Sequence, residues 1–340
     1  MSQEPAAIRA PELRGGYWVN SEPLTMESLR GRPVLIDFWD YTCVNCIRTL
    51  PYLVEWHRRY SPHGLVIVGV HTPEFSFAKR VDDVRRAMEQ FGIEYPVVLD
   101  NDYAIWRAYA NRYWPAKYLV DARGYIRYYH FGEGAYQATE KAIQQLLREV
   151  RPDVVFPEPM APVREEDRPG AVCYRVTPEL YLGYLRGNIG NPAGFVPKQA
   201  MDYQDPDVHA EGFYYLEGPW VVDEECVYRP WDAIRPGRVS LRYTAKEVNL
   251  VMNPLFGRPG RVTLLQDGAP LAAGHAGEDV RFDESGESYV EVDTPRMYRL
   301  VRNPDIGSHE LSLLTSAPGL ALYAFTFVSC VIPGWEMRLA

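Results

Sequence analysis

The sequence predicts two domains of different class: an α/β domain, followed by an all-β domain built as a sandwich or jelly roll. The chain has 340 residues, which is enough for about two domains of typical size. Up to residue 150, apolar strand-like runs alternate with helical patterns. Beyond residue 170, short strand-like runs are separated by Gly, Pro, Asp and Asn. Prolines number 9 in residues 1–150 and 19 in residues 151–340, so the two parts differ in composition as well.

The first domain is predicted to span residues 12–150. It opens with a nearly continuous apolar run over 34–39, which is typical of a strand covered on both faces. Apolar residues then recur at helical spacing from Ile47 to Val54. The remaining elements, in order, are a strand over 65–70, helices over about 78–91 and 102–110, strands over 96–99, 117–120 and 125–131, and a closing helix over about 136–149. This order predicts a mixed sheet with helices packed against it.

Residues 151–170 are predicted to be a proline-rich linker, because they hold five prolines and a run of five charged residues at 164–168. The second domain, residues 171–340, contains short strand-like runs and little helical periodicity. Residues 311–335 lack a charge over a length that could span a membrane. A turn signal at 316–319 and strand-forming residues after it favour two buried strands, so no membrane span is expected.

Charge excludes two classes of partner. The 36 basic and 45 acidic residues give a formal net charge of −9, which repels nucleic acid and anionic membrane surfaces. Residues 1–9 show no basic segment followed by an apolar one, so the expected location is cytoplasmic. Five cysteines do not suggest a disulfide framework. Cys173, Cys226 and Cys330 are far apart in sequence, and we expect them to be free, buried thiols.

Cys43 and Cys46 form the pair that indicates chemistry. They follow the strand over 34–39 and begin an amphipathic helix. Two intervening residues place the cysteines one helical turn apart, within reach of a disulfide. Cys43 lies at the helix N-terminus, where the helix dipole stabilises a thiolate, so it is the predicted nucleophile. Cys46 is predicted to be more buried and to resolve the mixed disulfide.

Two other interpretations of the pair stay open. A zinc site needs two further ligands, yet the other cysteines are isolated and the seven histidines form no pair at metal-ligand spacing. No metal and no cofactor is therefore predicted. The second alternative is a pair of core cysteines without a chemical role.

Residues 37–46 resemble the strand, turn and helix of the thioredoxin active site. Pro51 matches the proline within the thioredoxin helix, and Trp114-Pro115 matches the cis-proline that faces the active site in that superfamily. Residues 69–74, 111–115 and 131–134 resemble TlpA-like redoxins, and most closely the soluble C-terminal region of DipZ-type proteins. The resemblance implies a thioredoxin-like first domain and a second domain like a carbohydrate-binding module. It also implies, as the alternative location, a place outside the cytoplasm.

Two carboxylates are predicted to assist the cysteines. Asp37 interrupts an apolar strand, so burial should raise its pKa and suit it to proton transfer with Cys46. In TlpA-like proteins a glutamate at the position of Glu74 lies near the cysteine pair, so the resemblance adds Glu74 to the site. For Asp37 the alternative is a purely structural carboxylate, and for Glu74 it is an exposed acid in a loop.

Aromatic residues and Pro115 are the predicted binding groups. A cis Trp114-Pro115 bond would let the backbone of Trp114 pair with an extended substrate, and Trp39 and Trp114 are predicted to flank the site unless they only pack in the core. In the second domain a glycan is a possible partner. The aromatic residues considered for stacking on sugar rings, with core packing as the alternative, are Tyr203, Tyr214, Tyr215, Trp220 and Trp231.

The sequence thus predicts a thiol–disulfide oxidoreductase that exchanges a Cys43/Cys46 dithiol with disulfide-containing proteins or small molecules, regenerated by a redox partner of unknown identity. One alternative is a glycan- or protein-binding module with an accessory redox domain. A thiol peroxidase is the other alternative, but the peroxiredoxin Thr-x-x-Cys spacing is missing, because Thr42 is adjacent to Cys43.

Overall fold

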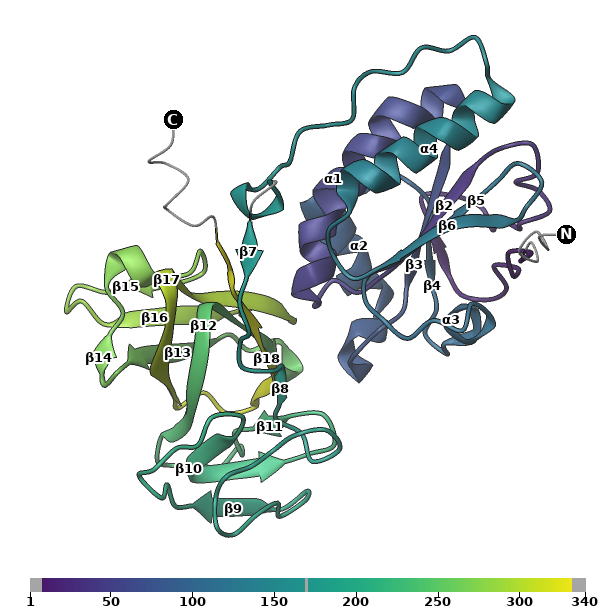
Figure 1. The fold of residues 1–340 in the computed structure, drawn as a ribbon. Helices are drawn as coiled ribbons and strands as arrows, with labels where there is room; N and C mark the ends of the chain where they lie inside the picture. The colour runs from purple at the N-terminus through teal and green to yellow at the C-terminus, as the bar shows by residue number, and fades with distance from the viewer. Residues whose placement is uncertain (1–7, 169–170, 332–340) are drawn as a thin grey trace, which may run out of the picture. The chain divides into compact units, whose positions relative to one another are not determined.

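A computed structural model describes residues 8–168 and 171–331 (Figure 1). The chain divides into two compact units between Asp167 and Arg168. The first unit is α/β and the second is strand-rich, so the predicted order of fold classes is confirmed.

The first unit is built on a six-stranded sheet with the strand order β1-β4-β3-β2-β5-β6. The strands are β1 (Trp18–Val19), β2 (Val34–Trp39), β3 (Val66–His71), β4 (Val97–Leu99), β5 (Ala116–Val120) and β6 (Ile126–Phe131). Strands β2, β3 and β4 are parallel, β5 runs antiparallel to β2, and β6 runs antiparallel to β5 and so in the direction of β2. Every residue of β2 is buried, as expected for the central strand of a sheet covered on both faces.

Four helices cover this sheet. They are α1 (Val44–Tyr60), α2 (Val81–Phe91), α3 (Ala104–Ala108) and α4 (Tyr136–Val150). Leu50 of α1, Val84 of α2 and Ile143 of α4 belong to one apolar cluster, whereas Ile105 of α3 belongs to the cluster on the opposite face. Figure 1 shows α1 and α4 on one side of the sheet and α3 on the other. Side chains therefore alternate between two cores along each central strand.

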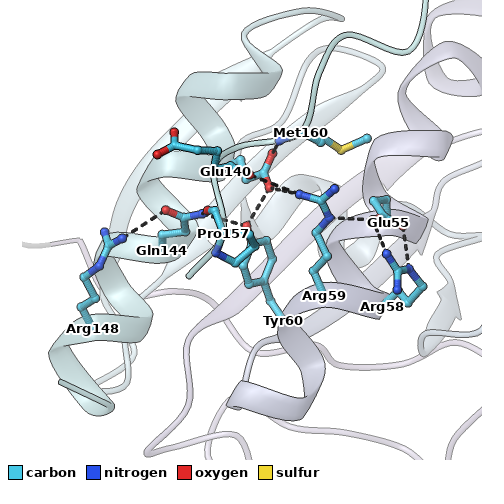
Figure 2. Close-up of polar contacts among 10 residues, drawn as sticks. Glu55, Arg58, Arg59, Tyr60, Glu140, Gln144, Arg148, Pro157 and Met160 are labelled. Carbon is cyan, nitrogen blue, oxygen red and sulfur yellow. Dashed lines mark hydrogen bonds and ion pairs between the residues drawn. The ribbon is translucent and has the colours of Figure 1, made fainter. Parts of the chain in front are cut away.

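Much of the segment predicted as a linker packs against the first unit. The buried carboxylate of Glu140 accepts hydrogen bonds from the Tyr60 hydroxyl at 2.6 Å and from the Met160 amide at 2.8 Å (Figure 2). Gln144 donates to the carbonyl of Pro157 at 2.8 Å. Further along, the Tyr52 hydroxyl donates to Asp167 at 2.7 Å. We call residues 156–167 the strap, because these contacts hold them on α1 and α4.

The second unit is all-β. Eleven of its described strands form one strongly bent sheet, with the order β15-β16-β13-β17-β12-β10-β11-β18-β8 and with β9 and β14 paired at the side. The strands are β8 (Leu180–Tyr181), β9 (Ala200–Tyr203), β10 (Tyr214–Val222), β11 (Val227–Tyr228), β12 (Gly237–Pro254), β13 (Gly260–Gln266), β14 (Ala269–Pro270), β15 (Arg281–Phe282), β16 (Ser288–Val292), β17 (Arg296–Thr315) and β18 (Leu320–Val328). The long strands β12 and β17 pair along most of their length, with register shifts near Glu247. These bulges let one strand contribute to two faces around a shared core. Kinship with carbohydrate-binding modules stays a prediction.

The cysteines of the second unit differ from expectation at one position. Cys226 is a free, buried thiol, as predicted, and burial raises its pKa to about 12. Cys173, expected to be free and buried, is exposed and disulfide-bonded. It lies in β7 (Val172–Cys173), which pairs with β19 (Cys330–Val331) so that Cys173 is opposite Cys330. The side chain of Cys330 is outside what the structure describes. Sequence separation hid this pairing, because the two short strands join the beginning and the end of the unit.

The uncharged stretch 311–335 forms the end of β17 and all of β18, as the turn signal predicted, and residues 332–335 lie outside the described part. None of the helices in the described residues has the length and apolar character needed to cross a membrane.

Candidate functional site

The two cysteines lie at the C-terminal edge of β2, where the chain turns into α1. Cys43 is the N-cap residue of α1, in extended backbone conformation, and its Sγ accepts a hydrogen bond from the Cys46 amide at 3.3 Å. Both are free thiols in this structure. Cys43 is half-buried and Cys46 is only 1% exposed. An accessible sulfur at a helix N-terminus with a covered one behind it is the asymmetry that a nucleophile and a resolving thiol require.

Burial is the main reason why the pKa of Cys46 lies well above that of an ordinary thiol. The hydrogen bond and charge of Cys43 raise this pKa further, and so does the negative charge of Asp37. Cys46 therefore stays protonated at neutral pH and needs a base when it reacts.

Asp37 faces Lys117, a residue that the sequence analysis missed. The two lie opposite each other in the β2–β5 ladder and both are almost completely buried. Burial raises the pKa of Asp37 to about 7, although the positive charge of Lys117 opposes the rise. Burial lowers the pKa of Lys117, while the charges of Asp37 and Cys46 oppose that change. Two groups of opposite charge thus share one apolar pocket beside the buried thiol. The sequence feature that could have identified Lys117 is a lysine within the otherwise apolar run 116–120.

Asp40 holds the cysteine turn and was also missed. Its Oδ1 accepts hydrogen bonds from the Thr42 amide at 2.6 Å and the Thr42 hydroxyl at 2.7 Å. Its Oδ2 accepts one from the Glu74 amide at 2.6 Å. Asp40 therefore joins the turn before Cys43 to the loop after β3. The signal was an Asp two residues before a Thr, which is typical of an Asx turn.

Glu74 lies in the loop after β3 and is half-buried. Its backbone amide, through Asp40, ties it to the cysteine turn. The role of its carboxylate beside the cysteine pair stays a prediction.

His71 is the last residue of β3 and lies in the same core. It is not among the site residues predicted from the sequence. Its ring stacks on Tyr41 at 5.5 Å and meets Trp39 edge-on at 5.1 Å between centroids. Burial lowers its pKa to about 3, so the ring is neutral at physiological pH. Trp39, predicted to flank the site, is fully buried here and packs as a core residue.

The Trp114-Pro115 peptide bond is cis. Ala116 pairs with Phe38 of β2, so Pro115 lies at the sheet edge from which the cysteine turn leaves. The half-buried Trp114 donates its indole N–H to the Thr72 carbonyl at 3.0 Å, and its ring packs 4.1 Å from that of Trp106. Cys43, Cys46 and Pro115 therefore meet at one edge of the sheet.

Most of the aromatic residues considered for stacking on sugar rings are covered by other residues of the second unit. Four of them are buried in its core, namely Tyr203, Tyr214, Tyr215 and Trp220, and Trp231 is 47% exposed. The core-packing alternative therefore accounts for four of the five. No group of three or more possible metal ligands occurs among the described residues.

Known proteins resemble both units. The AhpC/TSA family matches residues 9–129, and a family described as a thioredoxin-like C-terminal domain matches residues 177–327. The chain is 35% identical to protein DipZ of Mycobacterium tuberculosis over 323 residues, which cover 94% of this chain and 42% of DipZ. It thus spans less than half of that relative.

A shorter relative covers the first unit alone. The thiol-disulfide oxidoreductase YkuV of Bacillus subtilis is 32% identical over 141 residues, which cover 41% of this chain and 94% of YkuV. A solved structure described as a thioredoxin-like protein in the oxidized form is 31% identical and covers 42% of this chain and 97% of its own, with a TM-score of 0.39.

Proposed function

The chain belongs to the TlpA-like, DipZ-type thioredoxin family, and from this premise we propose that it exchanges its Cys43/Cys46 dithiol with disulfides of protein or small-molecule substrates. The observation that carries the proposal is the asymmetry of the pair. Cys43 is accessible at the N-cap of α1, whereas Cys46 is buried one turn behind it.

The reaction proceeds in two exchanges. The Cys43 thiolate attacks one sulfur of the substrate disulfide, forming a mixed disulfide and releasing the other sulfur as a thiolate. Cys46 then gives up its proton and attacks Sγ of Cys43, which releases the second substrate sulfur and leaves a Cys43–Cys46 disulfide. The substrate gains two electrons and the pair loses two. The reverse sequence oxidises a substrate dithiol, and a redox partner restores the starting state.

Asp37 is proposed as the proton acceptor for Cys46. Its pKa of about 7 allows it to take a proton near neutral pH and to release it afterwards. Glu74 is proposed to support this step more weakly. Pro115, with Trp114 before it, is proposed to hold an extended substrate segment beside Cys43, because the two meet at the same sheet edge.

An oxidising, extracytoplasmic compartment is the proposed location. The exposed disulfide at Cys173 supports it, since exposed thiols are kept reduced in the cytosol. Peptide mapping of protein isolated from its native cell without added reductant tests this: a Cys173-containing linked peptide is expected, and alkylated Cys173 would contradict the proposal.

The test of the exchange reaction is reduction of insulin disulfides by dithiothreitol in the presence of the full chain. Wild-type protein should accelerate the reduction, and Cys43→Ser should not. Cys226→Ala is the matched control, because it removes another free thiol without touching the pair. Equal activity of Cys43→Ser and wild type would overturn the proposal.

A further inference from the structure

Several buried polar groups of the first unit have no hydrogen-bond partner among the protein atoms of the described residues. They include both carboxylate oxygens of Asp37, Nε1 of Trp39 and Trp56, the hydroxyl of Tyr95 and Nδ1 of His57. Such groups are costly to bury unless an ordered water satisfies them. An ordered water among these atoms would satisfy them.

Three of these residues, Asp37, Trp39 and Tyr95, are neighbours around Gly69. Gly69 lies beside Asp37 in the β2–β3 ladder. A Cβ at Gly69 would lie 3.0 Å from Nε1 of Trp39 and 3.2 Å from a ring carbon of Tyr95. Because no side chain stands there, both rings come over the sheet next to the carboxylate. The charge of Asp37 also adds to the burial that raises the pKa of Tyr95.

His57 continues this series to the surface. Its ring lies 5.8 Å from that of Tyr95 between centroids, and it is half-buried, with Nδ1 covered. The charge of the exposed Glu94 acts on it from the outer side. His57 follows Cys46 by eleven residues on α1, which is about 16 Å along the helix. The series therefore leads away from the edge where substrate would bind.

We propose that the proton of Cys46 leaves through this series: from Asp37 past Tyr95, by way of ordered water, to His57 and the solvent. The proposal deepens the proposed function and rests on it. In the mixed disulfide, substrate covers Cys43 and the Pro115 edge, so a proton released behind them needs an exit on the far side. Lys117, from β5, and Cys46, from α1, are ionisable groups of the described residues that also interact with Asp37.

The proton balance of the step is complete. Asp37 takes the thiol proton as the Cys46 thiolate attacks Sγ of Cys43, and the substrate thiolate leaves on the open side. Asp37 then loses the proton to the water beside Tyr95, and His57 passes it to the solvent. His57 and Tyr95 act on Cys46 through Asp37 and are positioning residues.

The experiment separates the two exchanges in one trace. The full chain carries Cys173→Ser, Cys226→Ala and Cys330→Ser, so that Cys43 and Cys46 are its only cysteines. The reduced protein is mixed with 5,5′-dithiobis(2-nitrobenzoic acid) in a stopped-flow instrument. Attack by Cys43 releases the first thionitrobenzoate, and resolution by Cys46 releases the second.

Tyr95→Phe and His57→Ala, made in this protein, should each slow the second release on the order of tenfold and leave the first unchanged. Imidazole in the buffer should restore the second release in His57→Ala. If the variant were slow only because packing is lost, imidazole would not restore the rate. His63→Ala is the matched control and should change neither release. An unchanged second release in both variants, or a slow one in His57→Ala that imidazole does not restore, would overturn the route.

A second readout does not depend on activity. Nuclear Overhauser cross-peaks between water and the indole N–H of Trp39 are expected in the reduced full chain, and their absence would also overturn the route. Failure of the first release in the protein with Tyr95 and His57 intact would overturn the proposed exchange reaction, and the route with it.

Discussion

Asp37 and Lys117 lie directly opposite each other on β2 and β5, and neither side chain has a hydrogen-bond partner among the described residues. Each charge reduces the pKa shift that burial causes in the other. The proton affinity of the buried carboxylate therefore depends on a residue of a different strand.

Replacing Lys117 by Met should raise the pKa of Asp37 above about 7, because the positive charge that opposes the burial effect is lost. Carbon-13 NMR titration of the Asp37 carboxyl group measures this change. Lys141→Met, at an exposed position on α4, is the control and should leave the titration unaltered. A lower or constant value in Lys117→Met would mean that the two groups do not interact.

Asp37→Asn should stabilise the fold at high pH. The folded-state pKa of Asp37 is raised from 3.8 to about 7, so the folded protein keeps a proton that the unfolded chain loses. The stability of the wild type therefore falls as pH rises between these two values. The gain from the variant should be small near pH 4 and reach up to about 4 kcal/mol near pH 8. Urea unfolding at both pH values checks this, and a gain that shrinks with pH would contradict it.

Asp37→Asn should also slow resolution of the mixed disulfide, despite lowering the pKa of Cys46. Removing the negative charge eases ionisation of the thiol, but the acceptor for its proton is lost. Glu74→Gln should have a weaker effect in the same direction. The second thionitrobenzoate release, followed from about pH 5 to about pH 9, is the measurement. Rates equal to wild type in both variants would assign the two acids a structural role only.

Cys46→Ser should accumulate mixed disulfides with substrate, since Cys43 can attack but nothing resolves the product. Non-reducing gels of the variant after incubation with oxidised substrate should show the covalent adduct, which dithiothreitol removes. Cys43→Ser/Cys46→Ser is the control and should show none. Rapid clearance of the adduct in Cys46→Ser would indicate another resolving thiol.

Glu140→Leu should release the strap from α1 and α4. The carboxylate accepts hydrogen bonds from Tyr60 and Met160, and its loss leaves their donors unpaired at a cost of about 1–3 kcal/mol each. Proteolysis is expected first within residues 151–170 in the wild type, and faster there in the variant. Glu149→Leu, at an exposed position of α4, is the control. Unchanged cleavage in Glu140→Leu would show that other contacts hold the strap.

The sequence was sufficient for elements whose pattern is local. The apolar run 34–39 coincides with β2, and the cysteine spacing located the start of α1. The sequence was insufficient where strand pairing between distant segments determines which residues meet. Lys117 faces Asp37 because of the β2–β5 register, and Cys173 lies opposite Cys330 because two distant short strands meet. Prolines mark both extended linkers and extended segments that pack on a surface, so composition alone does not show that the strap contacts α1 and α4.

The reacting sulfur of Cys43 is also the cap of its own helix, since it accepts the hydrogen bond of the Cys46 amide. Oxidation converts this acceptor into one half of a disulfide and takes away the negative charge that the helix dipole favours. Each catalytic cycle thus removes and restores the best N-terminal cap of α1. In the disulfide form a covalent bond joins the same two residues, so the first turn of α1 is held by a hydrogen bond in one form and by a crosslink in the other.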